Sequence, residues 1–428
     1  MRRALTHVGG EAALSGDPDL ARKLAEALAV APSEQEGDTR DEGEDATRAH
    51  VHGFHSYPAR MHPLTAARLV RALTEPDMRV LDPFCGSGTV LVETLLAGRE
   101  PYGTDLNPLA VRLSQAKLRT WPEGYAEQLL SDAKAAAAFA DERRKARAGA
   151  SRRFGPEDVA LFSPHVLLEL GSLQEFIRGS ASKFDLELVL SSLLTKLSRR
   201  SGDSARSARA PREEEEGARE KRIAAGYPAK LLVKKTTEWI ARKTQFDDLK
   251  AAATASMTEK GMDFGRCVRI ENASVLKSLG AGIIDAIVTS PPYAATYDYY
   301  EHHADRLRWL DMDGSAFHAL ELGSRRSYRA LSPADTRRKW TTELTEMLRA
   351  FERVLAPGGT ITLMMADSAT RATVLRADEL VADAARPLGL TLLAAAAQAR
   401  PHFHLPTAAA FEREPRREHA LLLGRRDE

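Results

Sequence analysis

The sequence predicts an α/β fold with a mostly parallel sheet and a long helical insert, and three stretches carry this prediction. Residues 80–96 have the pattern of a strand, a glycine-rich turn and a helix, and residues 101–105 form a strand that ends in an acid. Residues 283–293 indicate a buried strand that stops at a Ser-Pro-Pro-Tyr turn, because proline cannot donate to a sheet ladder. In open α/β sheets ligands bind at the carboxyl ends of strands, so we expect the site where these strands end.

Size and composition allow one elaborated α/β domain or two to three domains. The chain has 428 residues, a formal net charge of +1 and two cysteines, Cys85 and Cys267, which lack metal-ligand spacing. Because the whole chain is nearly neutral, any nucleic-acid surface must come from local clusters of Lys and Arg. There is no apolar run of membrane-spanning length and no signal-peptide core, so we expect a soluble, cytoplasmic protein.

Residues 1–50 are predicted to be mostly a disordered tail. They are rich in Glu, Asp, Ala and Arg, and the acidic run 34–45 buries too little apolar surface to offset chain entropy. Only residues 21–31 have the pattern of a short amphipathic helix. Order is expected to begin at residues 53–61, an aromatic loop before a helix over residues 62–74.

The glycine-rich turn has the sequence Asp82-Pro83-Phe84-Cys85-Gly86-Ser87-Gly88-Thr89. Glycines let the backbone turn sharply and approach a ligand, and the helix that follows offers free N–H groups. No Lys-Ser/Thr pair follows the glycines, which argues against a nucleotide-hydrolysing P-loop, and Leu91 stands where a dinucleotide fingerprint needs its third glycine. Asp105 lies about 20 residues further on, where a carboxylate can accept both hydroxyls of a ribose.

The predicted helical insert covers residues 121–262 and separates the two halves of the sheet domain, residues 51–120 and 263–428. Helical patterns span residues 128–146, 166–177, 186–197 and 236–253. Basic residues in and beside them suit contacts with a phosphate backbone. The candidates are Arg199, Arg200, Arg206, Lys234 and Lys235. The acidic run 213–216 beside the arginines suits an ordinary solvated surface, so this interpretation stays open beside nucleic-acid contact.

The second half of the chain supplies the other strands of the sheet. We expect strands over residues 267–271, 360–364, 390–395 and 420–423, and helices over residues 337–355 and 373–385. Aromatic residues follow the Ser-Pro-Pro-Tyr turn and suit stacking on a base that has left the duplex. The histidines His302, His303, His402 and His404 lack a cysteine or carboxylate at metal-ligand spacing, so no metal site is expected.

Together, Thr289-Ser290-Pro291-Pro292-Tyr293 and the turn from Asp82 to Thr89 resemble the two main motifs of the amino-group DNA methyltransferases. These enzymes methylate N4 of cytosine or N6 of adenine with S-adenosylmethionine. The form with Ser before Pro-Pro-Tyr is commoner in the N4-cytosine branch, and the form with Asp or Asn is commoner for adenine. The resemblance covers residues 53–120 and 264–425 and implies a class I Rossmann-like methyltransferase sheet with an antiparallel last strand. By its location the insert resembles a target-recognition region.

The resemblance also assigns roles to residues. Asp82 would bind the methionine ammonium, Gly86 and Gly88 would lie beside methionine and ribose, and Asn272 would contact the adenine amine. The full set for the cofactor is Asp82, Phe84, Gly86, Gly88, Thr89, Asp105, Asn107, Asn272, His55, Ser56 and Tyr57. The catalytic turn would be Ser290, Pro291, Pro292 and Tyr293, with Tyr297 and the basic residues of the insert on nucleic acid.

The implied reaction needs no covalent enzyme intermediate. The Ser290 hydroxyl and the Pro291 carbonyl would accept the hydrogens of the amine and aim its lone pair at the methyl group, so positioning and fixed dipoles would supply most of the rate. No Pro-Cys nucleophile lies near the turn, which argues against C5-cytosine methylation, and Ser290 lacks the Gly-x-Ser-x-Gly context of a hydrolase.

Three alternatives stay open besides N4-cytosine methylation of double-stranded DNA. They are N6-adenine methylation, guanosine-N2 methylation of tRNA by a similar cofactor domain, and a non-catalytic nucleic-acid-binding protein with a relict cofactor pocket. An enzyme that acts alone and one with a cognate restriction or defence partner are both compatible with these motifs.

Overall fold

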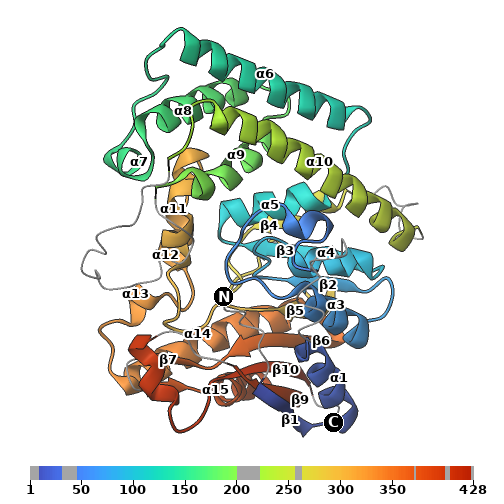
Figure 1. Cartoon of the computed structure of the whole chain (residues 1–428). Helices are drawn as coiled ribbons and strands as arrows, with labels where there is room; N and C mark the ends of the chain where they lie inside the picture. The colour runs from blue at the N-terminus through green and yellow to red at the C-terminus, as the bar shows by residue number, and fades with distance from the viewer. Residues whose placement is uncertain are drawn as a thin grey trace.

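The computed structural model describes residues 9–30, 46–199, 222–255, 263–370, 373–400 and 405–425. Within these residues an eight-stranded sheet crosses the molecule (Figure 1). Its strands are, from edge to edge, β1 (Gly9–Gly16), β9 (Leu390–Ala399), β10 (Arg417–Arg425), β6 (Leu355–Ala366), β5 (Ile284–Thr289), β2 (Arg79–Asp82), β3 (Glu100–Asp105) and β4 (Val268–Ile270).

The direction of the strands confirms the predicted fold class. Strands β4, β3, β2, β5 and β6 are parallel neighbours, and β10 lies antiparallel between β6 and β9. The chain leaves β2 toward β3 and β4, and then returns to β5 on the other side of β2. Ligands bind at such a reversal of strand order, outside the carboxyl ends of the strands. The topology therefore places the expected site at the ends of β2 and β5.

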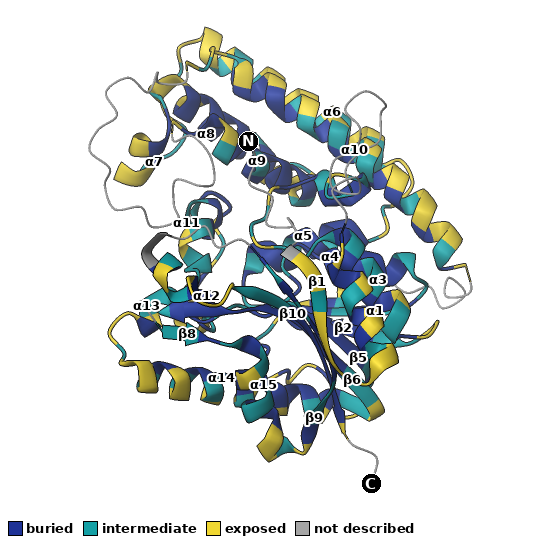
Figure 2. Cartoon of the chain, turned by 60° about the horizontal axis from the view of Figure 1, so that its bottom comes forward, coloured by how far each residue is buried: buried dark blue, intermediate teal, exposed yellow. Residues whose placement is uncertain are grey.

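Helices cover both faces of the sheet, and successive side chains of each strand point alternately to the two faces. In β10, Leu421 and Leu423 pack with α14 (Pro333–Val354) and α15 (Ala377–Ala385), whereas Ala420 and Leu422 pack with α1 (Pro18–Leu28) and α3 (Pro63–Leu73). Successive side chains of a strand point to opposite faces, which explains this division. Figure 2 shows the result, with the central strands buried and the edge strand β1 and the outer faces of the helices exposed.

The prediction of a disordered tail is wrong for residues 9–20, whereas the short helix expected over residues 21–31 is present as α1, which begins earlier, at Pro18. Strand β1 pairs antiparallel with β9 at the edge of the sheet, and α1 buries Ala21, Leu24 and Leu28 beneath it. Asp17 caps α1 by accepting hydrogen bonds from the backbone N–H groups of Asp19 and Leu20. Within α1 the charged residues lie on the exposed face and the apolar residues on the buried face, so a count of residue types underestimates the surface that this helix buries. Residues 31–45 lie outside the described part of the chain.

The insert forms the helices α6 (Tyr125–Lys145), α7 (Pro156–Leu161), α8 (Pro164–Arg178), α9 (Lys183–Leu197) and α10 (Tyr227–Ala253). The four predicted helical patterns correspond to α6, α8, α9 and α10, although α10 begins at Tyr227 rather than near residue 236. The insert shares one hydrophobic core with α4 (Thr89–Leu96) and α5 (Pro108–Leu118). At its centre the Trp239 ring stacks on Phe54 with the centroids 3.9 Å apart, and the Trp239 indole donates to Asp185.

Other elements were not predicted or differ from the prediction. Residues 373–375 form β8 (Thr373–Leu375), paired with β7 (Ser368–Thr370), so the predicted helix over residues 373–385 begins only at Ala377. Three helices follow the Ser-Pro-Pro-Tyr turn: α11 (Tyr299–Trp309), α12 (Ser315–Leu320) and α13 (Arg325–Tyr328). Short 3-10 turns complete the chain at η1 (His50–Gly53), η4 (Phe264–Cys267), η5 (Arg386–Leu388) and η6 (Leu405–Phe411). Among the described residues, none of the helices is both long and apolar enough to span a membrane.

Candidate cofactor and catalytic site

The two predicted motifs meet at the carboxyl ends of neighbouring strands. Strands β2 and β5 pair in parallel, with Leu81 opposite Ile287, so Asp82 and Thr289 end at the same edge. The Thr289 hydroxyl donates to Asp82 over 2.6 Å, although the two residues are 207 positions apart. This hydrogen bond connects the glycine-rich turn directly to the turn that begins at Ser290.

The glycine-rich turn is organised by Asp105 at the end of β3. Its carboxylate accepts the backbone N–H of Gly86 over 2.9 Å and that of Asn107 over 2.8 Å. Gly86 and Gly88 have positive φ values of 50° and 80°, which favour glycine. A Cβ atom on Gly88 would lie only 2.7 Å from the hydroxyl of Ser114 on α5, so this glycine allows the turn to pack closely on that helix.

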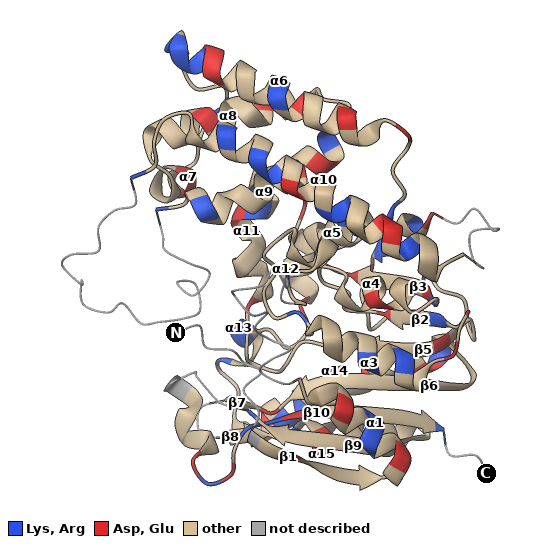
Figure 3. Cartoon of the chain, turned by 45° about the vertical axis from the view of Figure 1, so that its right-hand side comes forward, with Lys and Arg blue, Asp and Glu red and all other residues tan. Residues whose placement is uncertain are grey.

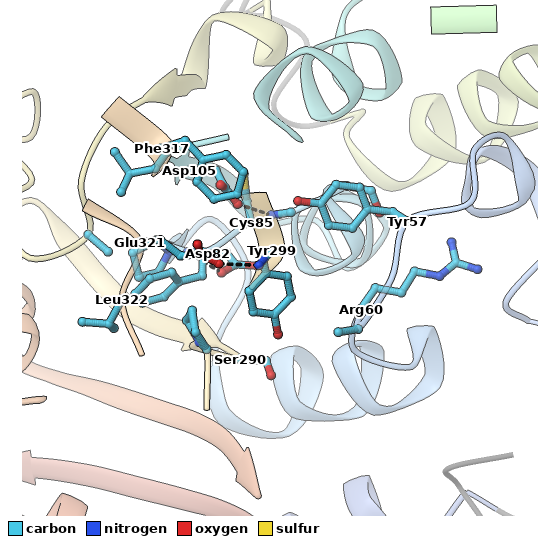
Figure 4. A pocket seen from close by; sticks show the side chains of 18 of the residues that line it. Tyr57, Arg60, Asp82, Cys85, Asp105, Ser290, Tyr299, Phe317, Glu321 and Leu322 are labelled. Atoms are coloured by element: carbon cyan, nitrogen blue, oxygen red, sulfur yellow. Dashed lines mark hydrogen bonds between the residues drawn. The ribbon is translucent and has the colours of Figure 1, made fainter. Parts of the chain in front are cut away.

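A cavity opens above these turns (Figure 4). It is lined by seven of the eleven residues predicted for the cofactor, and by two residues of the catalytic turn. They are Tyr57, Asp82, Phe84, Gly86, Thr89, Asp105 and Asn272, with Ser290 and Pro292. We refer to it as the cofactor cavity.

Two buried carboxyl groups give the cofactor cavity its electrostatic character. Burial raises the pKa of Asp82 to about 7, against hydrogen bonds from Thr289 and from the backbone of Phe84. Burial also raises the pKa of Asp105 to about 6. Nearby, the hydroxyls of Ser87 and Thr89 are buried and have no hydrogen-bond partner among the described residues. Such a set suits a ligand that combines positive charge with hydroxyl and amine groups, and S-adenosylmethionine, with its ammonium and sulfonium groups, fits that description.

We predict that cofactor affinity increases with pH between about 6 and 8. The protonated form of Asp82 cannot pair with an ammonium group, so binding near neutral pH must remove a proton. The affinity should change by up to about tenfold per pH unit below pH 7 and level off above it. Calorimetric titration in buffers of different ionisation enthalpy would measure both the affinity and the proton release. An affinity that is independent of pH in this range would contradict the assignment.

The same groups affect stability in the opposite direction when no cofactor is present. Their pKa values are raised above the ordinary value of 3.8 in the folded chain. Protonation therefore favours the folded state, and this contribution is complete below about pH 4 and is lost as the pH rises through about 6 to 7.

A second cleft of about 390 Å³ lies next to the cofactor cavity. The two share Ala59, Arg60, Met61, Ser290 and Tyr299 in their walls. Pro291, Tyr293 and Tyr297 line only the second cleft. Burial raises the pKa of the Tyr293 phenol to about 12, with the Ser290 hydroxyl partly opposing the shift, so this ring stays neutral. Ser290 therefore stands between a cavity with the predicted cofactor residues and a cleft with the predicted base-stacking residues.

Four residues predicted for the cofactor line neither space among the described residues. His55 is buried and hydrogen-bonds to Ser191 of α9 over 2.8 Å, and the exposed Ser56 accepts from Arg306. Asn107 caps α5 and donates to the Tyr57 hydroxyl over 3.1 Å, and Gly88 packs on α5. In these positions the four residues can support the residues that line the cofactor cavity.

Of the basic residues predicted for nucleic acid, the three that the structure describes, Arg199, Lys234 and Lys235, line neither space. Lys234 and Lys235 are on α10, where Lys235 forms an ion pair with Glu238, and the exposed Arg199 follows α9. Arg200, Arg206, His402 and His404 lie outside the described residues. Two buried or half-buried groups have metal-ligand geometry in the described part of the chain: His50, His52 and Glu93, and Asp367, Asp378 and His419. In the first group, burial and then the nearby Lys117 lower the pKa of both histidines, and in the second Arg376 pairs with Asp367. The expectation of no metal stays a prediction.

Several residues that shape the site were not predicted. Thr289 adjoins the motif and could have been suspected from its position, since it is the last residue of the strand. Arg60 lies in the predicted aromatic loop and reaches the backbone carbonyls of Thr47 and His52. Tyr299, Phe317 and Glu321 carry no local signal, because only the path of the chain after the turn brings them to the cofactor cavity.

Replacing Thr289 by valine tests the link between the two motifs. Valine keeps the shape but removes the hydroxyl, so Asp82 loses a donor that favours its charged form. We expect cofactor affinity at pH 7 to fall by about threefold to tenfold and the free energy of unfolding by about 1–2 kcal/mol. Calorimetric titration and denaturant unfolding would measure these changes. Thr362→Val on β6 is the matched control, since that hydroxyl is buried without a partner among the described residues; equal losses in both variants would rule out a specific link.

Comparison with known proteins points to one family. Residues 30–116 match the N6/N4 methylase family model, described as DNA methylase. A type II methyltransferase of Kocuria varians, M.MvaI, is 40% identical over 89 residues, which are 20% of this chain and 20% of that protein. A type II methyltransferase of Methanocaldococcus jannaschii, M.MjaII, is 33% identical over 84 residues, 19% of this chain and 16% of that protein. The chain thus matches about a fifth of the length of these relatives.

Solved structures resemble the chain only loosely. TrmN from Thermus thermophilus aligns with a TM-score of 0.31 and 12% identity, over 86% of this chain and 49% of that one. The rRNA methyltransferase aviRa from Streptomyces viridochromogenes aligns with a TM-score of 0.31 and 12% identity, over 93% and 94% of the two chains. These scores are too low to bear on the substrate.

Proposed function

We propose that this chain, which belongs to the amino-group DNA methyltransferase family, transfers a methyl group from S-adenosylmethionine to the exocyclic amine of a DNA base. The first candidate is N4 of cytosine, because Ser290 precedes Pro-Pro-Tyr. The observation that carries the proposal is the place of Ser290 between the cofactor cavity and the second cleft. The family match ends at residue 116, before the catalytic turn, so the reaction is argued from the residues of the site.

In the cofactor cavity each acidic residue has a distinct task. Asp82 at the end of β2 pairs with the ammonium group, and Asp105 at the end of β3 accepts the ribose hydroxyls. Thr89 and Ser87 offer hydroxyls that have no partner among the described residues. When bound, S-adenosylmethionine supplies a methyl group on a positively charged sulfur.

On the other side of Ser290 the second cleft receives the base. The Ser290 hydroxyl and the Pro291 carbonyl accept the hydrogens of the amine, and its lone pair is directed toward the cofactor cavity. The neutral Tyr293 ring offers a stacking face, which is worth roughly 1–3 kcal/mol per base. A base in a duplex must leave the stack to enter such a cleft. Positioning and fixed hydrogen-bond acceptors then lower the barrier without an enzyme nucleophile.

The insert is proposed to contact the DNA backbone through Arg199, Lys234 and Lys235. Acidic and basic residues are interspersed along α6 and α10 (Figure 3), so the contact would be local rather than spread over the whole insert. Neutralising both lysines should weaken DNA binding about equally for all sequences and reduce its dependence on salt.

A methyl-transfer assay tests the proposed function. Unmethylated genomic DNA and total tRNA are offered side by side with S-adenosylmethionine that carries a tritiated methyl group, and the product nucleosides are identified by mass. N4-methylcytosine in DNA is the expected product. N6-methyladenine would keep the reaction class and overturn the base. Label only in RNA, or no label with cofactor bound, would overturn the proposed substrate.

A further inference from the structure

Residues 314–323, here called the lid segment, lie over the cofactor cavity. They include α12, and they place Phe317, Leu320, Glu321 and Leu322 in its wall (Figure 4). With the lid segment in this position the cavity encloses about 100 Å³. The side chains of the lid segment therefore form part of the surface that would contact the cofactor, so whatever fixes the position of the lid segment supports binding.

The lid segment is tied to the catalytic turn and to the start of α11. The carbonyl of Gly323 accepts the backbone N–H of Ala295 over 2.8 Å. Gly323 has a φ of 64°, and a Cβ atom there would lie 3.4 Å from the backbone of Tyr293. The buried Glu321 carboxylate accepts the backbone N–H of Tyr299, the first residue of α11, and pairs with Arg326 over 2.7 Å. A shift of α11 would therefore change the position of the lid segment.

The other end of α11 is held by the insert. Asp158 of α7 has a side chain that is 1% exposed. It accepts the indole N–H of Trp309 over 2.9 Å and the guanidinium of Arg308 over 2.8 Å. Gln174 of α8 donates to the Trp309 carbonyl, and Arg178 of α8 pairs with Asp311. Asp158, Gln174 and Arg178 of the insert therefore hold the last turn of α11, and we call these three residues the clasp. Asp158 is its buried centre.

The middle of α11 connects the insert with the aromatic side of the cofactor cavity. His303 stacks on the Tyr57 ring with the centroids 4.7 Å apart, and Tyr57 lines the cavity. Arg306 donates to Thr195 of α9 over 2.8 Å and to Ser56 over 3.2 Å. Helix α11 has eleven residues, and at a rise of about 1.5 Å per residue it spans roughly 16 Å from the clasp to the cofactor cavity.

We propose that α11 transmits the position of the insert to the lid segment, and that Asp158 is a positioning residue for cofactor binding. The proposal deepens the function proposed above and rests on it, since the ligand is S-adenosylmethionine. It gives the insert a second task, separate from contact with DNA. A partner that moved α7 and α8 would thereby change cofactor retention.

The test is calorimetric titration of the full-length protein with S-adenosylmethionine, without DNA. Asp158→Asn removes the charge that Arg308 and Trp309 share, and we expect the Kd to rise about tenfold. Asp141→Asn is the matched control: this acid lies on α6 of the insert and forms ion pairs with Arg144 and Lys145 of the same helix, so the Kd should stay within twofold. Amide exchange at residues 314–323 should quicken in Asp158→Asn, while exchange at residues 89–96 of α4 stays unchanged.

A second variant keeps the proposal testable if Asp158→Asn does not fold. Asp311→Asn breaks the exposed ion pair with Arg178 in the same clasp, and we expect a Kd increase of about threefold. An unchanged Kd in a folded Asp158→Asn protein would overturn the proposal, as would quicker exchange spread evenly over the chain. Failure of the wild-type protein to bind S-adenosylmethionine would instead overturn the proposed function.

Discussion

Replacing Asp105 by alanine is expected to weaken the binding of S-adenosylmethionine by about a hundredfold or more. Its carboxylate is the proposed acceptor of both ribose hydroxyls, and hydrogen bonds to a charged group are worth about 1.5–3 kcal/mol each. The same carboxylate accepts the backbone N–H groups of Gly86 and Asn107, so the glycine-rich turn also loses its anchor. Calorimetric titration measures the Kd directly.

A matched control and a stability measurement separate these two causes. Asp248→Ala removes an exposed acid on α10 and should leave the Kd unchanged. If Asp105→Ala lowers the free energy of unfolding by only about 1–3 kcal/mol, the protein stays folded and the loss of affinity belongs to the site. Binding within threefold of the wild type would show that Asp105 serves the turn alone.

Replacing Ser290 by alanine is expected to reduce methyl transfer by about a hundredfold to a thousandfold, the usual effect of removing one positioned polar group from a reaction site. Cofactor affinity should stay within a few-fold, because Ser290 touches the cofactor cavity only at its border with the second cleft. Single-turnover transfer and direct titration measure the two effects separately. The same division is expected for Tyr293→Ala, whose ring lines the second cleft.

Substitution by asparagine sharpens the test of Ser290. Asparagine restores a carbonyl acceptor in the form that resembles the adenine enzymes, so Ser290→Asn should keep more activity than Ser290→Ala. Ser192→Ala is the control, since its hydroxyl bonds within its own helix. If Ser290→Ala lost cofactor binding outright, the division of labour between the two turns would be wrong.

Local signals explain what could be predicted from the sequence. A glycine-rich turn after a strand, an acid at the end of the next strand and two prolines after a third strand each depend on a few adjacent residues. These signals were enough to predict the parallel sheet, and seven of the eleven residues predicted for the cofactor line one cavity. They do not separate residues that line a cavity from residues that support it, which is why His55 and Asn107 were grouped with Tyr57 and Asp105.

The sequence by itself determined the fold class, the position of the site on the sheet and the chemistry of its two turns, because these follow from backbone preferences and strand ends. Only the tertiary structure decided that Thr289 donates to Asp82 and that Ser290 lies between two spaces. It also decided that β1 extends the sheet at its edge, with α1 packed against it, and that Asp158 of the insert holds Trp309. Each of these contacts joins residues more than a hundred positions apart, and their pairing depends on packing that no local pattern records.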